Sequence, residues 1–446
     1  MTIGGTMSSR IIAAVAGAAI ALGATAVHAM TLEEAVGLAI TTNPEVGAVA
    51  NDRLAVDEEL RQGKGLFYPQ IDVRAAGGAE YSDNVTTEAQ GRDSRTLFRK
   101  EAAVTLSQLL FDGFFASSEV QRQRARVRSA AYRVGETAEF VGLDAVEGFL
   151  EVLRHRARVD IAEQNVQVHR DILASVQRRA DIGGGGIGDV RQAEARQAAA
   201  RSALVQTQGD LRDAEALFIR VVGQAPESLS DPTVPAGMLP TDSEQAVAAA
   251  VENSPTIAFA RADVETAEAD VRQQEASLYP DFRAELGGTV VDNVDGRTDT
   301  EYDATAMLVM RWNLYRGGAD AARVREFKHR LAEANDTQRI SERNVSENAR
   351  VSWNAMQVAK ANVVVLNENV EANQRTREIY RQQFDIGQRG LLDLLDSENE
   401  LFLSRENLVT ARYAELFANY RLLATSGALV KSLGLAAPEA AQLPAD

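Results

Sequence analysis

The chain lacks cysteine and has few aromatic residues, and both shortages narrow its possible functions. Of its 446 residues none is cysteine, and 6% are aromatic. Without cysteine there is no disulfide, no thiolate metal site, no cysteine nucleophile and no acylated lipoprotein anchor. The formal charge of −17 is also informative, because binding to nucleic-acid phosphates needs clustered Lys and Arg. We therefore expect no nucleic-acid partner.

Long hydrophobic runs are missing beyond the N-terminus. No segment after residue 30 holds 18 consecutive apolar residues, so we expect no transmembrane helix in the mature chain, and any contact with a membrane must use strands. At the N-terminus, Arg10 precedes the Ala-rich stretch Ile11–Ala26 and then Val27-His28-Ala29, a small-x-small cleavage site. This order is typical of a secretory signal peptide, which we place at residues 1–29; an uncleaved anchor is the alternative.

The remaining chain consists of one unit that occurs twice. The sequence NPEV at Asn43–Val46 recurs as SPTI at Ser254–Ile257, displaced by 211 residues, and a Tyr-Pro pair follows both at the same displacement. The later sequence LLFDG at Leu109–Gly113 recurs as NLYRG at Asn313–Gly317, displaced by 204 residues. The displacement changes by seven residues in one segment, as a surface loop tolerates. We expect two structural repeats whose tip loops differ in length.

Each repeat is predicted to contain a helix, two strands, a very long helix and a further helix. The first repeat spans residues 30–240 and the second spans residues 241–430, followed by a tail at residues 431–446. Within the first repeat, the opening helix runs from about Leu32 to Gly65 and ends before a Tyr-Pro pair, since proline cannot continue a helix. The predicted strands lie near residues 68–85, 96–111, 279–293 and 300–315, the long helices at 114–180 and 319–384, and the final helices at 187–223 and 391–427.

The strands alternate between apolar and polar residues, which is the period of a strand between two environments. Phe282, Leu286 and Val290 share one face of the third strand, while Arg283 and Glu285 share the other. Four such strands cannot close a membrane barrel, and open edges in lipid leave backbone groups unpaired. Several copies must therefore share one barrel. A dimer, a trimer or a tetramer would each meet this requirement.

The long helices carry a seven-residue apolar repeat. Val120, Val127, Val134 and Val141 recur every seven residues, with alanines between them. Such a repeat imposes a left-handed supercoil on packed helices, and each proline-free stretch would be roughly 100 Å long. An ordinary long coiled coil is the alternative interpretation.

These features together resemble the TolC family of outer-membrane channels, over essentially the whole mature chain. The resemblance rests on the doubled Asn/Ser-Pro, the doubled Tyr-Pro, the doubled aromatic-x-Gly at Phe111–Gly113 and Tyr315–Gly317, and the segment Phe384–Tyr413. It implies a homotrimer with a twelve-stranded outer-membrane β-barrel, four strands from each protomer, continuous with a long α-helical periplasmic barrel. It also implies contact with outer-membrane lipid, a periplasmic adaptor protein and an inner-membrane transporter.

The resemblance also implies a gate at the periplasmic tip, where polar links hold the closed channel. This role carries over to Arg389 on the inner turn and Asp189 on its partner turn. Asp393 and Asp396 are three residues apart on one helix face and would form two stacked carboxylate rings that attract cations. Phe384 stands where relatives often have tyrosine, so a gating hydrogen bond does not carry over to it. Helix capping is the alternative role of the aspartates.

No catalytic, cofactor or metal motif has a suitable context. Gly183, Gly185 and Gly188 have the spacing G-x-G-x-x-G, but a helix precedes them instead of the strand that nucleotide binding requires. The histidines of the mature chain are isolated on long helices and lack a neighbouring ligand. We therefore expect a passive protein that is not an enzyme and has no cofactor or metal.

Two functions within the family remain open. One is the exit duct of type I protein secretion, driven by an ATP-hydrolysing transporter, and the other is the outlet of a proton-driven multidrug efflux pump. The segments Asp181–Arg196 and Leu110–Val120 resemble type I members, and the missing lipoprotein cysteine disfavours the lipidated drug-pump branch, so we favour type I secretion. A periplasmic coiled-coil scaffold without a pore is an alternative of another class, against which the alternating strands argue.

Overall fold

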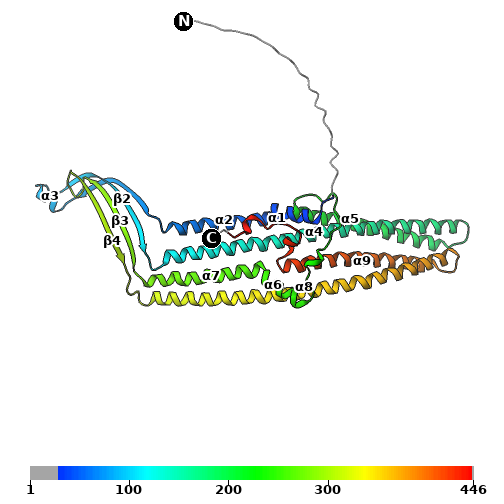
Figure 1. Ribbon diagram of the computed structural model, residues 1–446. Coiled ribbons are helices and arrows are strands. Elements are labelled where there is room, and N and C mark those ends of the chain that lie inside the picture. The colour runs from blue at the N-terminus through cyan, green and yellow to red at the C-terminus, as the bar shows by residue number, and fades with distance from the viewer. Residues whose placement is uncertain (1–28, 444–446) are drawn as a thin grey trace, which may run out of the picture.

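The protein is an elongated protomer with a sheet at one end and long helices that run away from it (Figure 1). A computed structural model describes residues 29–443, so residues 1–28 of the predicted signal peptide lie outside the described part. The elements in chain order are α1 (Leu32–Thr42), α2 (Pro44–Gly65), β1 (Gln70–Ser82), α3 (Val85–Ala89), β2 (Arg95–Phe111), α4 (Phe115–Asp181), α5 (Ile187–Val222), η1 (Ala236–Met238), α6 (Ser243–Asn253), α7 (Pro255–Glu275), η2 (Ala276–Leu278), β3 (Asp281–Asp292), β4 (Thr300–Arg311), α8 (Ala319–Asp385), α9 (Leu391–Thr425), α10 (Leu429–Ser432) and η3 (Glu439–Ala441).

The four strands form one antiparallel sheet in the order β1-β2-β3-β4. Each repeat contributes one hairpin, and β1 and β4 are the two edges. The first hairpin loop, residues 83–94, contains the short helix α3, which the sequence analysis did not predict. The second loop, residues 293–299, is shorter. The two repeats therefore differ in the length of this loop, which lies in the segment where the displacement changes from 211 to 204 residues.

The register of the strands gives the sheet one apolar and one polar face. Val73 pairs with Val104, Val104 pairs with Gly288, and Leu286 pairs with Ala306, so the apolar side chains of all four strands share a face. Paired residues lie on the same side of a pleated sheet. The large apolar side chains that are exposed on this face are Ile71, Val73, Tyr81, Phe98, Val104, Leu286, Val290, Tyr302, Leu308 and Met310.

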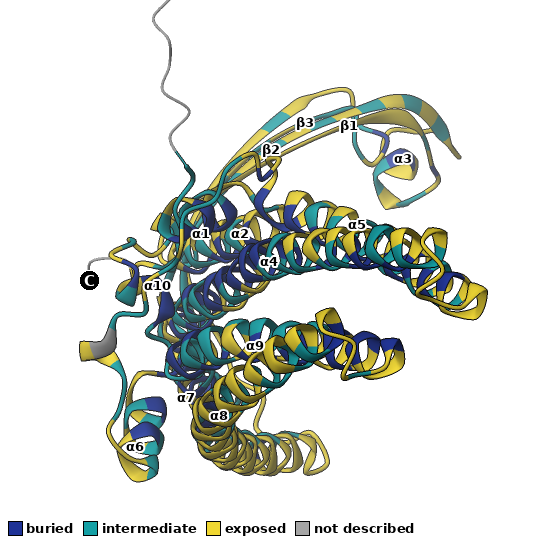
Figure 2. Ribbon diagram, turned by 90° about the vertical axis from the view of Figure 1, so that its right-hand side faces the viewer, coloured by how far each residue is buried: buried dark blue, intermediate teal, exposed yellow. Residues whose placement is uncertain are grey.

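Helix α4 is the central element of the helical part, where it packs against α5, α7, α2, α9 and α1. The helices form two hairpins, α4 with α5 and α8 with α9, whose turns lie at the end far from the sheet (Figure 1). An end-on view shows α4 largely buried and α8 largely exposed (Figure 2). Within residues 29–443, no helix has an apolar stretch long enough to cross a membrane.

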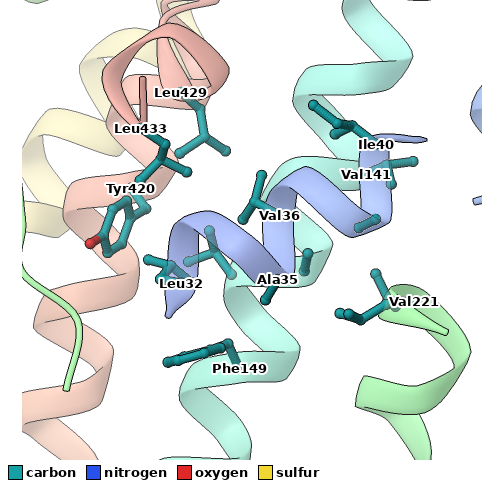
Figure 3. Packing of buried hydrophobic residues seen from close by; sticks show 14 of the residues in the cluster. Leu32, Ala35, Val36, Ile40, Val141, Phe149, Val221, Tyr420, Leu429 and Leu433 are labelled. Atoms are coloured by element: carbon teal, nitrogen blue, oxygen red, sulfur yellow. The ribbon is translucent and has the colours of Figure 1, made fainter. Parts of the chain in front are cut away.

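The main core lies where α1 crosses α4 (Figure 3). Leu32 and Val36 of α1 contact side chains of α4, α9 and α10, and Phe149 of α4 packs on Phe218 of α5 with ring centroids 6.4 Å apart. The seven-residue valine repeat of α4 is buried throughout, as predicted, and so are the alanines between its members. Small alanines in the seam let the neighbouring helices approach closely.

The expectation of one continuous opening helix was wrong. The helix ends at Thr42, and a new one begins at Pro44. Pro44 has no N–H to donate and forces Asn43 into an extended conformation, with ψ at 129°. The Asn43 side chain then accepts a hydrogen bond from the Glu45 N–H at 2.9 Å and caps the second helix. The second repeat also breaks before a proline, at Ser254 between α6 and α7, but there the serine side chain does not cap the second helix.

Candidate functional site

The helical turns far from the sheet have the same local geometry in both repeats. Gly183 and Gly387 adopt left-handed backbone conformations, with φ at 75° and 78°. The Gly183 N–H donates to the carbonyl of Ala180, and the Gly387 N–H donates to the carbonyl of Phe384, both at 3.0 Å. Glycine takes this conformation without a steric cost and ends the helix. The two turns therefore form a defined tip rather than a frayed end.

Arg179 of α4 holds the C-terminus of α8. Its two terminal guanidinium nitrogens donate to the carbonyl of Phe384 at 3.0 Å, and one also donates to the carbonyl of Asp385 at 3.0 Å. The guanidinium lies 4.3 Å from the centroid of the Phe384 ring. The last carbonyls of a helix have no partner within it, and a cation there complements the helix dipole. We call Arg179, Phe384 and Asp385 the tip clamp.

Phe384 itself is buried in a small apolar cluster that joins the two hairpins. The cluster contains Ile172, Val176, Val190, Ala193, Phe384, Leu391, Leu394 and Leu395. These residues come from α4, α5, α8 and α9. The phenyl ring therefore contributes apolar packing and a face for the Arg179 cation, where a tyrosine would offer a hydroxyl.

Arg389 makes its contacts within its own hairpin. Its Nε donates to the side chain of Gln383 at 3.0 Å, and its guanidinium carbon lies 4.0 Å from the centroid of the Tyr380 ring. A terminal nitrogen lies 3.5 Å from a carboxylate oxygen of Asp393. Asp189, in the first turn of α5, has no ion pair among the described residues. The predicted Arg389–Asp189 lock is therefore absent within the protomer and stays a prediction about neighbouring copies.

The predicted ring residues Asp393 and Asp396 are both on α9, and their side chains are half exposed. Asp396 accepts a hydrogen bond from Arg196 of α5 at 2.9 Å, so it links the two hairpins. Asp393 lies near Arg389 as described above. Both carboxylates are thus partly neutralised within the protomer, and their role as stacked rings stays a prediction.

Arg179 and Arg196 were not predicted from the sequence, and neither was a buried ion pair above the tip. Glu398 is 4% exposed, and its Oε2 lies 3.3 Å from Arg377. Burial raises the pKa of Glu398, while the Arg377 charge opposes that change. The pair lines a cavity of about 390 Å³ between α4 and the second hairpin. Glu398 could have been found in the sequence, because it is a charged residue at an apolar position of the seven-residue repeat. Arg179 could not, because its partner is a backbone carbonyl and no residue type marks such a partner.

The sheet is the second functional element, because its two faces suit two different solvents. Large apolar side chains cover one face, as described above, while the other face carries most of the charge. The charged residues on the polar face are Asp72, Arg74, Glu80, Arg95, Arg99, Glu101, Asp281, Arg283, Glu285, Glu301, Asp303 and Arg311. Arg99 pairs with Glu80, and Arg283 pairs with Asp281. An exposed apolar face of this size needs a partner, and lipid is the one that a membrane barrel has.

Comparison with known proteins places the chain in a family. Residues 35–224 and 246–428 match the family described as Outer membrane efflux protein, with one segment in each repeat. The outer membrane efflux protein BepC of Brucella suis is 28% identical over 382 residues, which cover 85% of this chain and 81% of BepC. The alkaline protease secretion protein AprF of Pseudomonas aeruginosa is 22% identical over 414 residues, which cover 90% of this chain and 85% of AprF.

A solved structure shares the fold. The outer membrane protein VceC of Vibrio cholerae superposes with a TM-score of 0.74 at 16% identity, over 90% of this chain and 96% of VceC. The predicted architecture is confirmed: three copies contribute twelve strands to one β-barrel, which continues into a helical barrel in the periplasm. Channels of this kind act with a periplasmic adaptor protein and an inner-membrane transporter. The chain belongs to the outer membrane efflux protein family and is the outer-membrane channel of a tripartite export system.

Proposed function

We propose that this channel is the exit duct of a type I secretion system, which exports a polypeptide with the energy of an ATP-hydrolysing inner-membrane transporter. The observation that carries the proposal is the polar face of the sheet, where charged side chains of both signs alternate and pair. A wall of this kind is well hydrated and, apart from exposed side chains such as Met307, offers an extended polypeptide little apolar surface to adhere to. The similarity to AprF, a protease secretion protein, also supports a polypeptide as the exported molecule. The duct itself catalyses no reaction.

Deletion of the gene tests this proposal. We expect the culture medium to lose one or a few secreted proteins, while sensitivity to antibiotics and detergents stays unchanged. Complementation with the wild-type gene should restore secretion. An unchanged set of secreted proteins would contradict the proposal.

The outlet of a multidrug efflux pump is the second candidate. The similarity to BepC favours it, because BepC is named an efflux protein and has the higher identity of the two relatives, 28% against 22%. The same deletion strain separates the two functions. Raised sensitivity to several unrelated drugs, with normal protein secretion, is the result that efflux requires.

We further propose that the tip is a gate, which opens when the adaptor and the transporter dock. In this proposal the α8–α9 hairpin moves away from the α4–α5 hairpin. The tip clamp and the Arg196–Asp396 contact link the two hairpins, so both must break. Asp393 and Asp396 of three copies would then attract cations to the opening.

The clamp predicts a specific conductance change in planar lipid bilayers. Arg179→Ala should raise the conductance of the purified trimer several-fold, because the C-terminal carbonyls of α8 lose their donor from α4. Arg178→Ala is the matched control, since Arg178 carries the same charge on the preceding, exposed position. Equal conductance of the two variants would exclude the clamp from the gate.

The lock between Arg389 and Asp189 has its own test. Arg389→Ser should raise conductance, and Asp189→Asn should raise it to a similar extent if the two side chains pair between copies. An increase in Arg389→Ser alone would assign the effect to Asp393, its neighbour within the protomer. Unchanged conductance in both variants would remove the lock.

A further inference from the structure

The two hairpin loops at the end of the sheet far from the helices are docked on each other. The Asp295 N–H donates to the carboxylate of Glu80 at 2.7 Å, and Arg95 donates to the carbonyl of Gly296 at 3.3 Å. The Asn84 side chain donates to the carbonyl of Asp295 at 3.4 Å. Because the helices extend into the periplasm, this end of the sheet lies at the extracellular mouth of the barrel.

The contact between the loops is tightly packed. Thr87 of α3 is fully buried, at 0% exposure. A methyl group added to Gly296 would lie 2.5 Å from the Thr87 Cγ2, so glycine is the residue that fits there. Gly296 also has a left-handed backbone, with φ at 77°, and so does Asp295, with φ at 54°. The second loop therefore presents a preformed surface to α3.

Every strand residue in this docking site lies on the polar face of the sheet. Glu80 pairs in register with Leu97, and Ser82 pairs with Arg95. These positions share a face with the charged residues described above, opposite to the apolar side chains. Figure 2 accordingly shows α3 on the concave side of the curved sheet. Since the apolar face must contact lipid, the polar face lines the pore, and the docked loops extend over the pore.

We propose that the docked loops, residues 83–94 and 293–299, form a lid that narrows the extracellular mouth of the trimeric channel. Three copies place three such lids around one pore. The lid restricts which molecules enter the barrel from outside, independently of the gate at the periplasmic tip. The lid thus selects solutes by size at the extracellular end of the channel, where it keeps bulky toxic solutes of the medium out of the barrel.

The test measures how fast a reagent outside the cell reaches a single cysteine introduced into the barrel. The natural chain has no cysteine, so only the introduced thiol can react. Thr105→Cys places a thiol on the polar face, and Val104→Cys places one on the apolar face as a control. Intact cells are treated with a small maleimide or with a bulky polyethylene-glycol maleimide. With the natural loops, Cys at position 105 should react with the small reagent and at least about tenfold more slowly with the bulky one, since slow access follows rare opening of the lid.

Two changes should undock the lid and remove the size restriction. In the first, residues 83–94 are replaced by a copy of residues 293–299, the shorter loop of the second repeat. In the second, Thr87→Lys puts a charged side chain into the buried contact, and Val85→Lys is the matched control on an exposed position of α3. The bulky reagent should then label Cys at position 105 about tenfold faster in both lid variants, with the Val85→Lys rate unchanged.

Other outcomes overturn the proposal. Fast labelling by the bulky reagent with natural loops would show that the mouth is open, and equal rates in all loop variants would show that the loops do not restrict entry. Labelling by the small reagent, together with heat-stable trimers on gels, confirms that each variant is assembled. The periplasmic gate does not affect this readout, because the labelled residue lies between the mouth and the tip.

Discussion

The two long helices have the same length but different environments. Helices α4 and α8 each contain 67 residues and occupy equivalent places in the two repeats. Helix α4 buries 27 of its residues within the protomer, and α8 buries six. The repeat therefore determines where a long helix begins and ends, but not how much of it is covered.

The exposed surface of α8 carries its own apolar repeat. Val351, Val358 and Val365 recur every seven residues, and all three are about half exposed or more. Ala372 and Ile379 continue the spacing. An apolar seam of this period packs against another helix, and within residues 29–443 no helix of the same protomer covers these valines. We infer that a neighbouring copy in the trimer completes α8 in the way that α5 and α7 complete α4.

The largest effect is expected when a charged residue is placed in the exposed valine seam of α8. Val358→Asp should abolish the trimer while each chain keeps its helical content, because a carboxylate would be buried without a partner between copies. Heat-stable trimer bands and circular dichroism measure the two properties. Val364→Asp, on an exposed position outside the seam, should leave the trimer intact, and loss of the trimer in both variants would argue against a specific seam.

A cavity in the α4 core should destabilise the protomer itself. Phe149 is fully buried against Phe218, so Phe149→Ala should cost about 3–5 kcal/mol of unfolding free energy. Chemical denaturation in detergent, followed by circular dichroism, measures the cost. Val364→Ala is the matched truncation on α8, at an exposed position outside the seam, and should change the unfolding free energy little. Similar losses in both variants would contradict the comparison.

A buried carboxylate makes α4 sensitive to pH, whereas α8 has an exposed arginine, Arg343, at the equivalent position. Glu139 accepts hydrogen bonds from the N–H groups of Leu429 and Val430, at 2.9 and 3.2 Å, and so holds α10. Burial raises the Glu139 pKa from 4.5 to about 7, and the two hydrogen bonds oppose this rise.

Between these two pKa values the folded protein binds a proton that the unfolded chain has released. Unfolding free energy should therefore fall as pH rises through this window, by about 3 kcal/mol for a shift of this size. Glu139→Gln should remove this slope, which denaturation at several pH values across the window measures. An unchanged slope in the variant would assign the pH dependence to other groups.

The smallest expected difference concerns the turns that precede the two helices. Gly113 and Gly317 both have left-handed backbones, with φ at 68° and 62°. A methyl group on Gly113 would lie 2.7 Å from the carbonyl oxygen of Ala276, whereas one on Gly317 would meet nothing within 4 Å. Gly317→Ala should thus lower the unfolding free energy by about 1–2 kcal/mol from backbone strain alone. Gly113→Ala should lower it further, because the added methyl group also clashes with the Ala276 carbonyl. Equal unfolding free energies for the two variants would contradict this reading of the turn.

Much of the architecture was predictable because its causes are local. Proline, the left-handed glycines and the period of apolar residues act over a few positions, so strands and helices lie close to their predicted ranges. The helix break at Asn43 was missed although its signal, the Asn-Pro pair, was visible. The short helix α3 lies in a loop whose polar composition predicts a turn and does not specify a helix.

The candidate site was less predictable because it depends on distant segments. Arg389 and Asp393 were identified and do lie together, but Asp189 is not paired with Arg389 in the protomer. Arg179 and Phe384 are 205 positions apart in the chain. Their contact requires the two hairpins to meet at the tip, and no spacing along the sequence reports that meeting.

The sequence by itself determined the doubled unit, the long helices and the need for several copies, because four alternating strands with two open edges cannot be stable alone in lipid. The tertiary structure decided which copy of the repeat is buried and which is exposed, which arginine holds the tip, and on which face of the sheet the loops dock. These outcomes follow from the packing of segments about 200 residues apart, where each contact depends on the placement of whole elements rather than on local preference.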